Sequence, residues 1–146
     1  MYDSVMSGAV IYTANCDRLA AFYVAVIGFR ECERKPDYVV LEDATVQLVL
    51  LRAADPVHAA SAGAAAAAPP VDAGQAPRRS EASIKPVFRV ASIEAARAAA
   101  ASAGGSINAA RHEWRFGAHR VCDGLDPDGN VIQLRELWNA TTPRRS

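Results

Sequence analysis

The segment Asp126-Pro127-Asp128-Gly129-Asn130-Val131-Ile132-Gln133-Leu134-Arg135-Glu136 decides the fold of this chain. Its first four residues predict a tight turn, because proline presets φ and glycine supplies the positive φ that a reversal needs. In the residues that follow, Ile132 and Leu134 share one face and are apolar. Gln133 and Arg135 share the opposite face and are polar. The pattern predicts a β-strand with an apolar back and a polar front.

The composition limits the class of protein. A chain of 146 residues is long enough for one domain with a proper core. Sixteen basic and sixteen acidic side chains cancel, so there is no electrostatic case for nucleic acid or an anionic membrane as partner. No apolar run reaches the roughly 18 residues of a membrane span, and the N-terminus does not resemble a signal peptide. Three cysteines without CxxC spacing predict reduced thiols, so we expect a cytoplasmic protein.

The chain repeats one order of predicted elements, a strand, a helix and three strands, within a single domain over residues 1–146. The first unit covers residues 7–52, with a strand at 8–13, a helix at 18–26 and strands at 29–33, 38–41 and 46–52. The second unit covers residues 84–138, with a strand at 87–90, a helix at 93–103 and strands around Ile107, at 114–122 with Gly117 as a candidate break, and at 131–137. Residues 53–83 are rich in alanine and proline and predict a flexible linker, and residues 139–146 predict a frayed tail.

Two pairs of positions align the units. Asn15 and Ser92 can each cap a helix, and Val46-Gln47-Leu48 corresponds to Ile132-Gln133-Leu134. With the closing motif at residues 126–130 and the Gly28-Phe29 exit of the first helix, the pattern resembles the paired βαβββ modules of the vicinal-oxygen-chelate superfamily. This group contains glyoxalase I, bleomycin-resistance proteins and extradiol dioxygenases. The resemblance implies an α+β fold, with two modules forming a curled mixed sheet around a cavity, and a homodimer.

The resemblance also implies where a metal would bind, on the first and last strand of each module. Counting back seven residues from each helix cap, and taking the two aligned glutamines, gives Gly8, Gln47, Lys85 and Gln133. Glycine offers no donor atom, and a lysine cation repels a divalent ion unless it loses its proton. Two neutral amide oxygens make a weak site. We therefore expect no metal and no cofactor.

The sheet face opposite the helices is expected to line a small-molecule pocket, because it mixes apolar with a few polar side chains. Lys85, Arg89 and Arg135 would suit a carboxylate or phosphate, whereas Gln47 and Gln133 can both donate and accept hydrogen bonds. Tyr12 and Trp114 would add aromatic surface, which completes the candidate pocket residues. The alternative is that Arg89 and Arg135 pair with acidic neighbours such as Glu136 or Glu113.

Three functions remain open. The first is a metal-free protein that binds an anionic or aromatic small molecule, similar to bleomycin-resistance proteins. The second is a metal-dependent lyase, isomerase or dioxygenase with a non-standard site, and the third is an enzyme that uses Lys85 as a base or Schiff-base amine. The residues at Gly8 and Lys85 favour the first function. No catalytic residue is predicted, and Cys122 is expected to be a buried thiol rather than a nucleophile.

Overall fold

The structure is a computed structural model that describes residues 6–53 and 84–139. The predicted linker apart from Ala53, and the predicted tail apart from Asn139, lie outside the described residues. The first module contains β1 (Ser7–Thr13), α1 (Cys16–Ile27), β2 (Arg30–Lys35), β3 (Tyr38–Glu42) and β4 (Val46–Arg52). The second contains β5 (Val87–Arg89), α3 (Ile93–Ser102), β6 (Ser106–Ile107), the 3₁₀ turn η1 (Ala110–His112), β7 (Trp114–Phe116), β8 (His119–Leu125) and β9 (Val131–Leu137).

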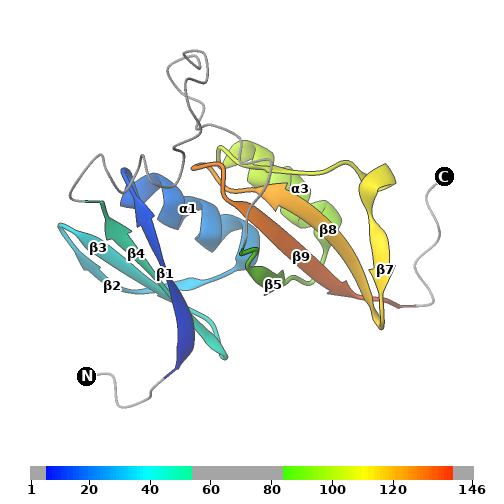
Figure 1. The fold of residues 1–146 in the computed structure, drawn as a ribbon, viewed down its shortest axis with the longest axis horizontal. Helices are drawn as coiled ribbons and strands as arrows, with labels where there is room; N and C mark the ends of the chain where they lie inside the picture. The colour runs from blue at the N-terminus through cyan, green and yellow to red at the C-terminus, as the bar shows by residue number, and fades with distance from the viewer. Residues whose placement is uncertain (1–5, 54–83, 140–146) are drawn as a thin grey trace.

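Each module builds its own mixed sheet (Figure 1). The first sheet has the order β1-β4-β3-β2, and the second has β5-β9-β8-β6 with β7 also paired to β8. In both sheets the first strand runs parallel to the last strand of its module, and the other pairs are antiparallel. The α+β fold of two modules is confirmed, with its strands divided between two open sheets.

Capping side chains set the start of both helices, and a glycine sets the end of α1. The Asn15 side chain accepts a hydrogen bond from the Arg18 backbone N–H at the start of α1, and Gly28 ends the helix with φ of 86°. The Ser92 hydroxyl accepts from the Ala95 backbone N–H at the start of α3. Glu136 on β9 adds a second cap, because its carboxylate accepts from the Ile93 backbone N–H at 2.7 Å. Both predicted helices are confirmed to within two residues.

The two modules share one hydrophobic core, because α1 and α3 pack against each other (Figure 1). Four aromatic rings meet there. Tyr23 contacts Phe22 edge to face at 5.3 Å between ring centroids, and it contacts Phe88 of β5 at 5.4 Å. Phe29 and Phe88 are also edge to face, at 5.8 Å. Neither helix among residues 6–53 and 84–139 is long and apolar enough to cross a membrane.

The Asp-Pro-Asp-Gly turn joins the second module to the first. Asp126 is only 2% exposed, and its carboxylate accepts a hydrogen bond from the Tyr23 hydroxyl of α1 at 2.8 Å. Burial is the main cause that raises the pKa of Asp126, and it also raises the pKa of Tyr23. Asp128 binds the first module twice more, through the Thr13 hydroxyl and the Arg18 guanidinium. The turn therefore holds the two modules together.

The strand predicted for residues 114–122 is divided at its candidate break. It forms a hairpin, since β7 and β8 pair across a turn in which Gly117 has φ of 57°. Near the start of β1, Ala9 is exposed although it shares a face of the strand with Ile11. Ile11 does pack against the core.

Candidate functional site

The faces of the two sheets that turn away from the helices carry the candidate site residues. On the first sheet, Val10 and Tyr12 of β1 remain 54% and 56% exposed. On the second sheet, Val87 is 46% exposed and Phe116 is 57% exposed. Apolar side chains with this exposure are unusual on a purely solvated sheet face and are typical of a surface that meets a ligand or a partner.

A glutamine is paired with a carboxylate on each of these faces. In the first module Gln47 lies opposite Glu42, and the Gln47 amide nitrogen donates to the Glu42 carboxylate at 2.8 Å. In the second module Gln133 lies opposite Asp123, and its amide nitrogen donates to the Asp123 carboxylate at 3.3 Å. The predicted correspondence of the two glutamines thus extends to their hydrogen-bond partners.

Gly8 lies beside Gln47 in the parallel pair of β1 and β4. A Cβ atom placed on Gly8 would lie 2.0 Å from the backbone oxygen of Gln47, much closer than any real contact. The two strands can approach this closely only because position 8 has no side chain. Position 8 of this strand therefore has no room for a metal-binding side chain.

In the second module a chain of polar contacts surrounds Gln133. The Lys85 ammonium forms an ion pair of 2.6 Å with Asp123, which also accepts from the Gln133 amide. The Gln133 side-chain oxygen accepts from Nε of Arg135 at 3.0 Å. The guanidinium carbon of Arg135 lies 4.9 Å from the centroid of the Phe116 ring, a cation–π contact. Gln133 itself is 8% exposed, so its amide orientation is fixed by these partners.

The strand register alters the predicted equivalence of Gly8 and Lys85. Val87, not Lys85, lies opposite Gln133, as Gly8 lies opposite Gln47. Asn15 follows Gly8 by seven residues, whereas Ser92 follows Val87 by only five, so equal counting from the two caps misplaces the position. Lys85 precedes β5 and is exposed.

The residues at these positions do not fit a divalent metal. Glycine and valine supply no side-chain donor, and the Gln133 oxygen already accepts from an arginine cation. Among residues 6–53 and 84–139, no group of three or more histidine, cysteine, aspartate or glutamate side chains is placed to hold an ion.

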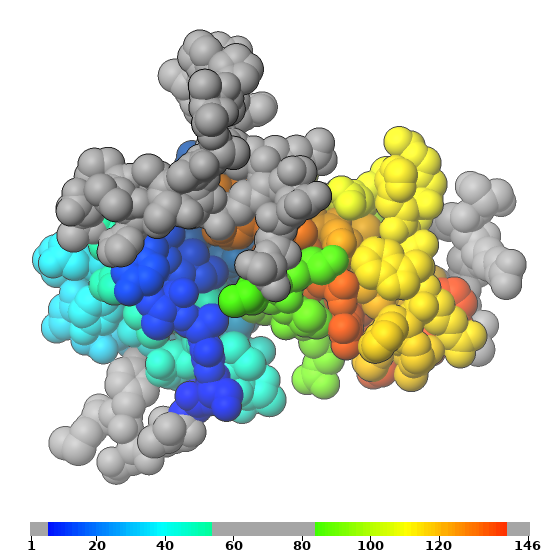
Figure 2. Space-filling view, in the orientation of Figure 1, coloured from blue at the N-terminus to red at the C-terminus, as the bar shows by residue number. Residues whose placement is uncertain are grey.

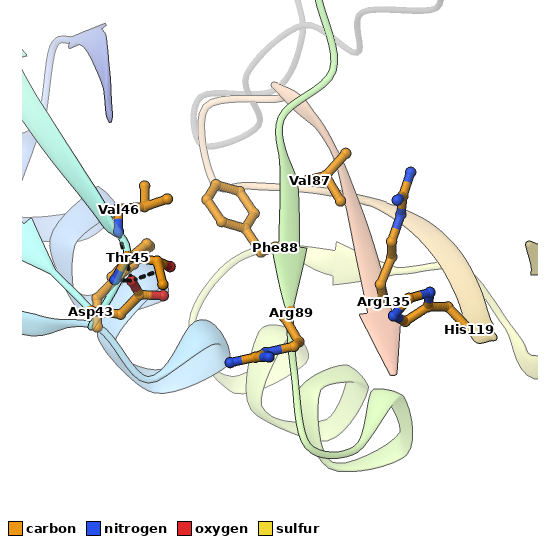
Figure 3. A pocket seen from close by; sticks show the side chains of 9 residues that line it. Asp43, Thr45, Val46, Val87, Phe88, Arg89, His119 and Arg135 are labelled. Carbon is orange, nitrogen blue, oxygen red and sulfur yellow. Dashed lines mark hydrogen bonds between the residues drawn. The ribbon is translucent and has the colours of Figure 1, made fainter. Parts of the chain in front are cut away.

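A shallow pocket of about 230 Å³ lies at the junction of the two modules. In Figure 2 the green surface of β5 separates the blue and cyan first module from the orange and yellow strands of the second. The pocket is lined by Phe29, Asp43, Thr45, Val46, Val87, Phe88, Arg89, His119 and Arg135. Figure 3 shows Arg89 extending from β5 toward the turn that carries Asp43, whereas Arg135 and His119 lie on the other side of β5.

The structure brings together only part of the predicted pocket. Arg89 and Arg135 line it, and the side chain of Gln133 contacts Arg135. Lys85 is paired with Asp123 instead of sharing a ligand position with Arg89. The remaining candidates lie elsewhere on the open faces: Tyr12 and Gln47 on the first sheet, and Trp114, 41% exposed, on β7.

The acidic partners considered as an alternative for Arg89 and Arg135 are engaged by other groups. Glu136 caps α3, and Glu113 forms ion pairs with Arg97 at 2.5 Å and with Arg120 at 3.6 Å. The arginines therefore do not pair with these two carboxylates.

Asp123, His119 and Asp43 are site residues that sequence reasoning missed. Asp123 and His119 share one face of β8, which becomes evident only when the strand is separated from the hairpin turn at Gly117. The alternation of residues 119–125 was the available signal, but the register against β9 that sets Asp123 opposite Gln133 cannot be read from one sequence.

The comparisons with known proteins agree with this geometry. The sequence profile of the Glyoxalase/Bleomycin resistance protein/Dioxygenase superfamily matches residues 5–134. The chain belongs to this superfamily. No protein in the comparison with curated sequences matches significantly.

Solved structures of other proteins share the fold at low sequence identity. A glyoxalase/bleomycin resistance protein/dioxygenase family enzyme from Burkholderia phytofirmans is 21% identical with a TM-score of 0.63, over 90% of this chain and 98% of that chain. The antibiotic binding protein TnmS3 from a Streptomyces species is 20% identical with a TM-score of 0.56, over 94% and 99%. The fosfomycin resistance protein FosX from Listeria monocytogenes is 13% identical with a TM-score of 0.58, over 91% and 93%.

Proposed function

We propose that this superfamily member is a metal-free binding protein for an anionic or partly aromatic small molecule. The pocket at the module junction supports this proposal, since it combines apolar walls with the guanidinium groups of Arg89 and Arg135. An antibiotic binding protein with the same fold shows that the scaffold can serve binding, although the ligand of that protein does not transfer to this chain.

The observation that carries the proposal is the state of the metal-binding positions. A side chain at position 8 would collide with the Gln47 backbone, and Val87 stands where the second module's first ligand would be. At the last strand, Gln133 accepts from Arg135 with the oxygen that a metal would need. A divalent ion could bind only by breaking these contacts. Its coordination by neutral amide oxygens would offset little of the free energy lost.

Metal analysis of the full chain tests the proposal directly. We expect purified protein, exposed in turn to Mn²⁺, Fe²⁺, Ni²⁺ and Zn²⁺ and then desalted, to retain far less than one ion per chain. Stoichiometric metal that survives desalting would overturn the proposal and would favour a metal-dependent lyase, isomerase or dioxygenase. The Gln133→Leu variant is the control, because metal that it retains equally must be bound elsewhere.

A thermal-shift screen of small carboxylic acids, phosphates and aromatic antibiotics is the route to the ligand. A compound present at 100 times its dissociation constant adds about 2.7 kcal/mol to the free energy of unfolding, which raises the melting temperature by several degrees. The proposal predicts hits among anions and aromatic compounds. If none of them stabilises the protein, the binding function is wrong.

We also propose that the protein is a cytoplasmic homodimer. The exposed apolar side chains of the open sheet faces, such as Val10 and Phe116, support a second copy that covers them. The buried Cys16 and Cys122 are thiols without a disulfide, which suits a reducing compartment. Light scattering coupled to gel filtration is expected to give twice the mass of the chain, and a monomer at micromolar concentration would contradict the dimer.

A further inference from the structure

The Arg135 guanidinium is the most strongly oriented cation in the pocket. Its Nε donates to the Gln133 oxygen at 3.0 Å, and its guanidinium carbon lies over the Phe116 ring, 4.9 Å from the centroid. The two terminal amino groups of Arg135 have no hydrogen-bond or ion-pair partner in the part of the chain that the structure describes. An arginine held in this way keeps a planar pair of donors available at little further cost in side-chain entropy.

Gln133 is itself held in one orientation. Its amide nitrogen donates to Asp123, so its oxygen must face Arg135. The charge of Asp123 is balanced by Lys85 at 2.6 Å. The connected contacts from Lys85 through Asp123 to Gln133 therefore fix the position of the Arg135 guanidinium. This cation lies on the strand that metal-binding members of the fold would use for a metal ligand.

The other cations near the pocket are less suited to bind an anion. Arg89 extends toward Asp43 (Figure 3). Burial acts to raise the pKa of the Asp43 carboxyl, but hydrogen bonds from the Thr45 and Val46 backbone, and to a smaller extent the charge of Arg89, lower it. Lys85 is neutralised by Asp123. Arg135 also has apolar neighbours, since its guanidinium lies over the Phe116 ring and Val87 lines the same pocket. A carboxylate attached to an apolar or aromatic group matches this arrangement.

We propose that Arg135 recognises the carboxylate of the ligand through its terminal amino groups, and that Gln133 is a positioning residue that holds Arg135 and does not touch the ligand. The proposal rests on the small-molecule binding function proposed above and names the class of ligand, an organic carboxylate with an apolar or aromatic body. It makes the guanidinium the fixed positive charge of a site that has no metal.

Titration of the ¹⁵N-labelled full chain with benzoate tests both parts, with benzyl alcohol as the neutral probe of the same shape. We expect benzoate to bind in roughly the millimolar range, as a small ligand with one bidentate contact should, and to shift the Arg135 Nε–H and Val87 backbone resonances. Benzyl alcohol should bind at least about tenfold more weakly, because it cannot accept two hydrogen bonds from the guanidinium. Inorganic phosphate distinguishes a general anion site from a carboxylate site, and tighter binding of phosphate than benzoate would overturn the proposed ligand class.

The variants separate recognition from positioning. Arg135→Gln is expected to weaken benzoate binding by at least about tenfold. Arg115→Gln is the matched control and should leave binding unchanged, because Arg115 also stacks on a ring, that of Trp138, and donates Nε to a backbone oxygen, but does not line the pocket. Equal loss in both variants would mean that only net charge matters and would overturn the role of Arg135.

Gln133→Leu keeps the size of the buried side chain and removes the acceptor. We expect the Arg135 Nε–H to exchange faster with water and benzoate binding to weaken several-fold. Gln133→Glu restores the acceptor but neutralises the guanidinium, so the Nε–H should remain protected while benzoate binding is lost. A protected Nε–H and full binding in Gln133→Leu would overturn the positioning role.

The outcomes also separate this inference from the proposed function. If wild-type protein binds benzoate and Arg135→Gln binds it equally well, the inference is wrong and the binding function stands. If the thermal-shift screen yields only neutral ligands and benzoate does not bind, the inference again fails alone. If no compound of any class binds, both fail.

Discussion

At the scale of single residues, position 8 shows how the absence of a side chain determines both packing and chemistry. Gly8 allows β1 to lie against the backbone of Gln47, and the same closeness removes a place for a metal ligand. Glycine at position 8 therefore matters first for the pairing of β1 with β4 and only second for the chemistry of the candidate site. The missing donor atom, which is evident from the sequence, is one effect of this glycine. The close approach of β1 to β4 is the other.

Gly8→Ala is expected to destabilise the protein by about 2–3 kcal/mol, because the new Cβ must push β1 away from β4. Urea unfolding of the full chain measures this change. Gly117→Ala is the control, since position 117 has φ of 57° and no heavy atom near the added Cβ, and should cost only about 1 kcal/mol. Equal costs for the two variants would show that β1 does not contact β4 as closely as described.

The three cysteines are expected to react in a fixed order with a neutral alkylating reagent at pH 8. Cys32 is half-buried, whereas Cys16 and Cys122 are buried, and desolvation raises the pKa of both buried thiols. A raised pKa lowers the thiolate fraction at this pH, so mass spectrometry should find Cys32 modified first. In urea all three should react at similar rates. Early modification of Cys122 in the folded protein would contradict its inert, structural role.

At the scale of elements, the Asp-Pro-Asp-Gly turn does more than reverse the chain before β9. It places Asp126 against α1, so that a turn of the second module accepts a hydrogen bond from a helix of the first. The carboxylate is buried, and loss of a partner there is costly because water cannot replace it.

Tyr23→Phe is therefore expected to lower the free energy of unfolding by about 1.5–3 kcal/mol at neutral pH, since it removes a donor from a buried carboxylate. Tyr38→Phe is a matched control. Its hydroxyl also donates to a carboxylate at 2.8 Å, that of Glu33, but at a partly exposed position, and its loss should cost less than about 1 kcal/mol. Urea unfolding compares the two, and equal costs would argue against the turn as the link between modules.

At the scale of the whole molecule, the two sheets are separate but the core is not. Phe22, Tyr23 and Phe29 from the first module meet Phe88 from the second in one cluster. The pocket adjoins this core, because Phe29 and Phe88 line it together with exposed residues such as Arg89. The stability of the core and the shape of the binding site therefore both depend on how the two modules pack against each other.

Phe88→Ala is expected to destabilise both modules together, by about 3–5 kcal/mol, because it opens a cavity in their shared core. Hydrogen exchange should show amides of α1 and α3 losing the same amount of protection. Phe116→Ala, at a position 57% exposed, should cost less than about 1 kcal/mol. Loss of protection confined to the second module in Phe88→Ala would mean that the modules unfold independently.

The sequence by itself determined the modules, the two helices with their caps, and most of the strands, because these depend on local periodicity, on capping residues and on turn chemistry at Gly28 and residues 126–129. It also predicted a glycine and two glutamines at positions where the family resemblance implies metal ligands. Only the tertiary structure decided the partners of each polar side chain: Asp123 for Lys85, Gln133 for Arg135, and Val87 rather than Lys85 as the counterpart of Gly8. The physical reason is that strand register and the direction of long side chains arise from contacts between segments far apart in the chain, and one sequence carries no local signal for them.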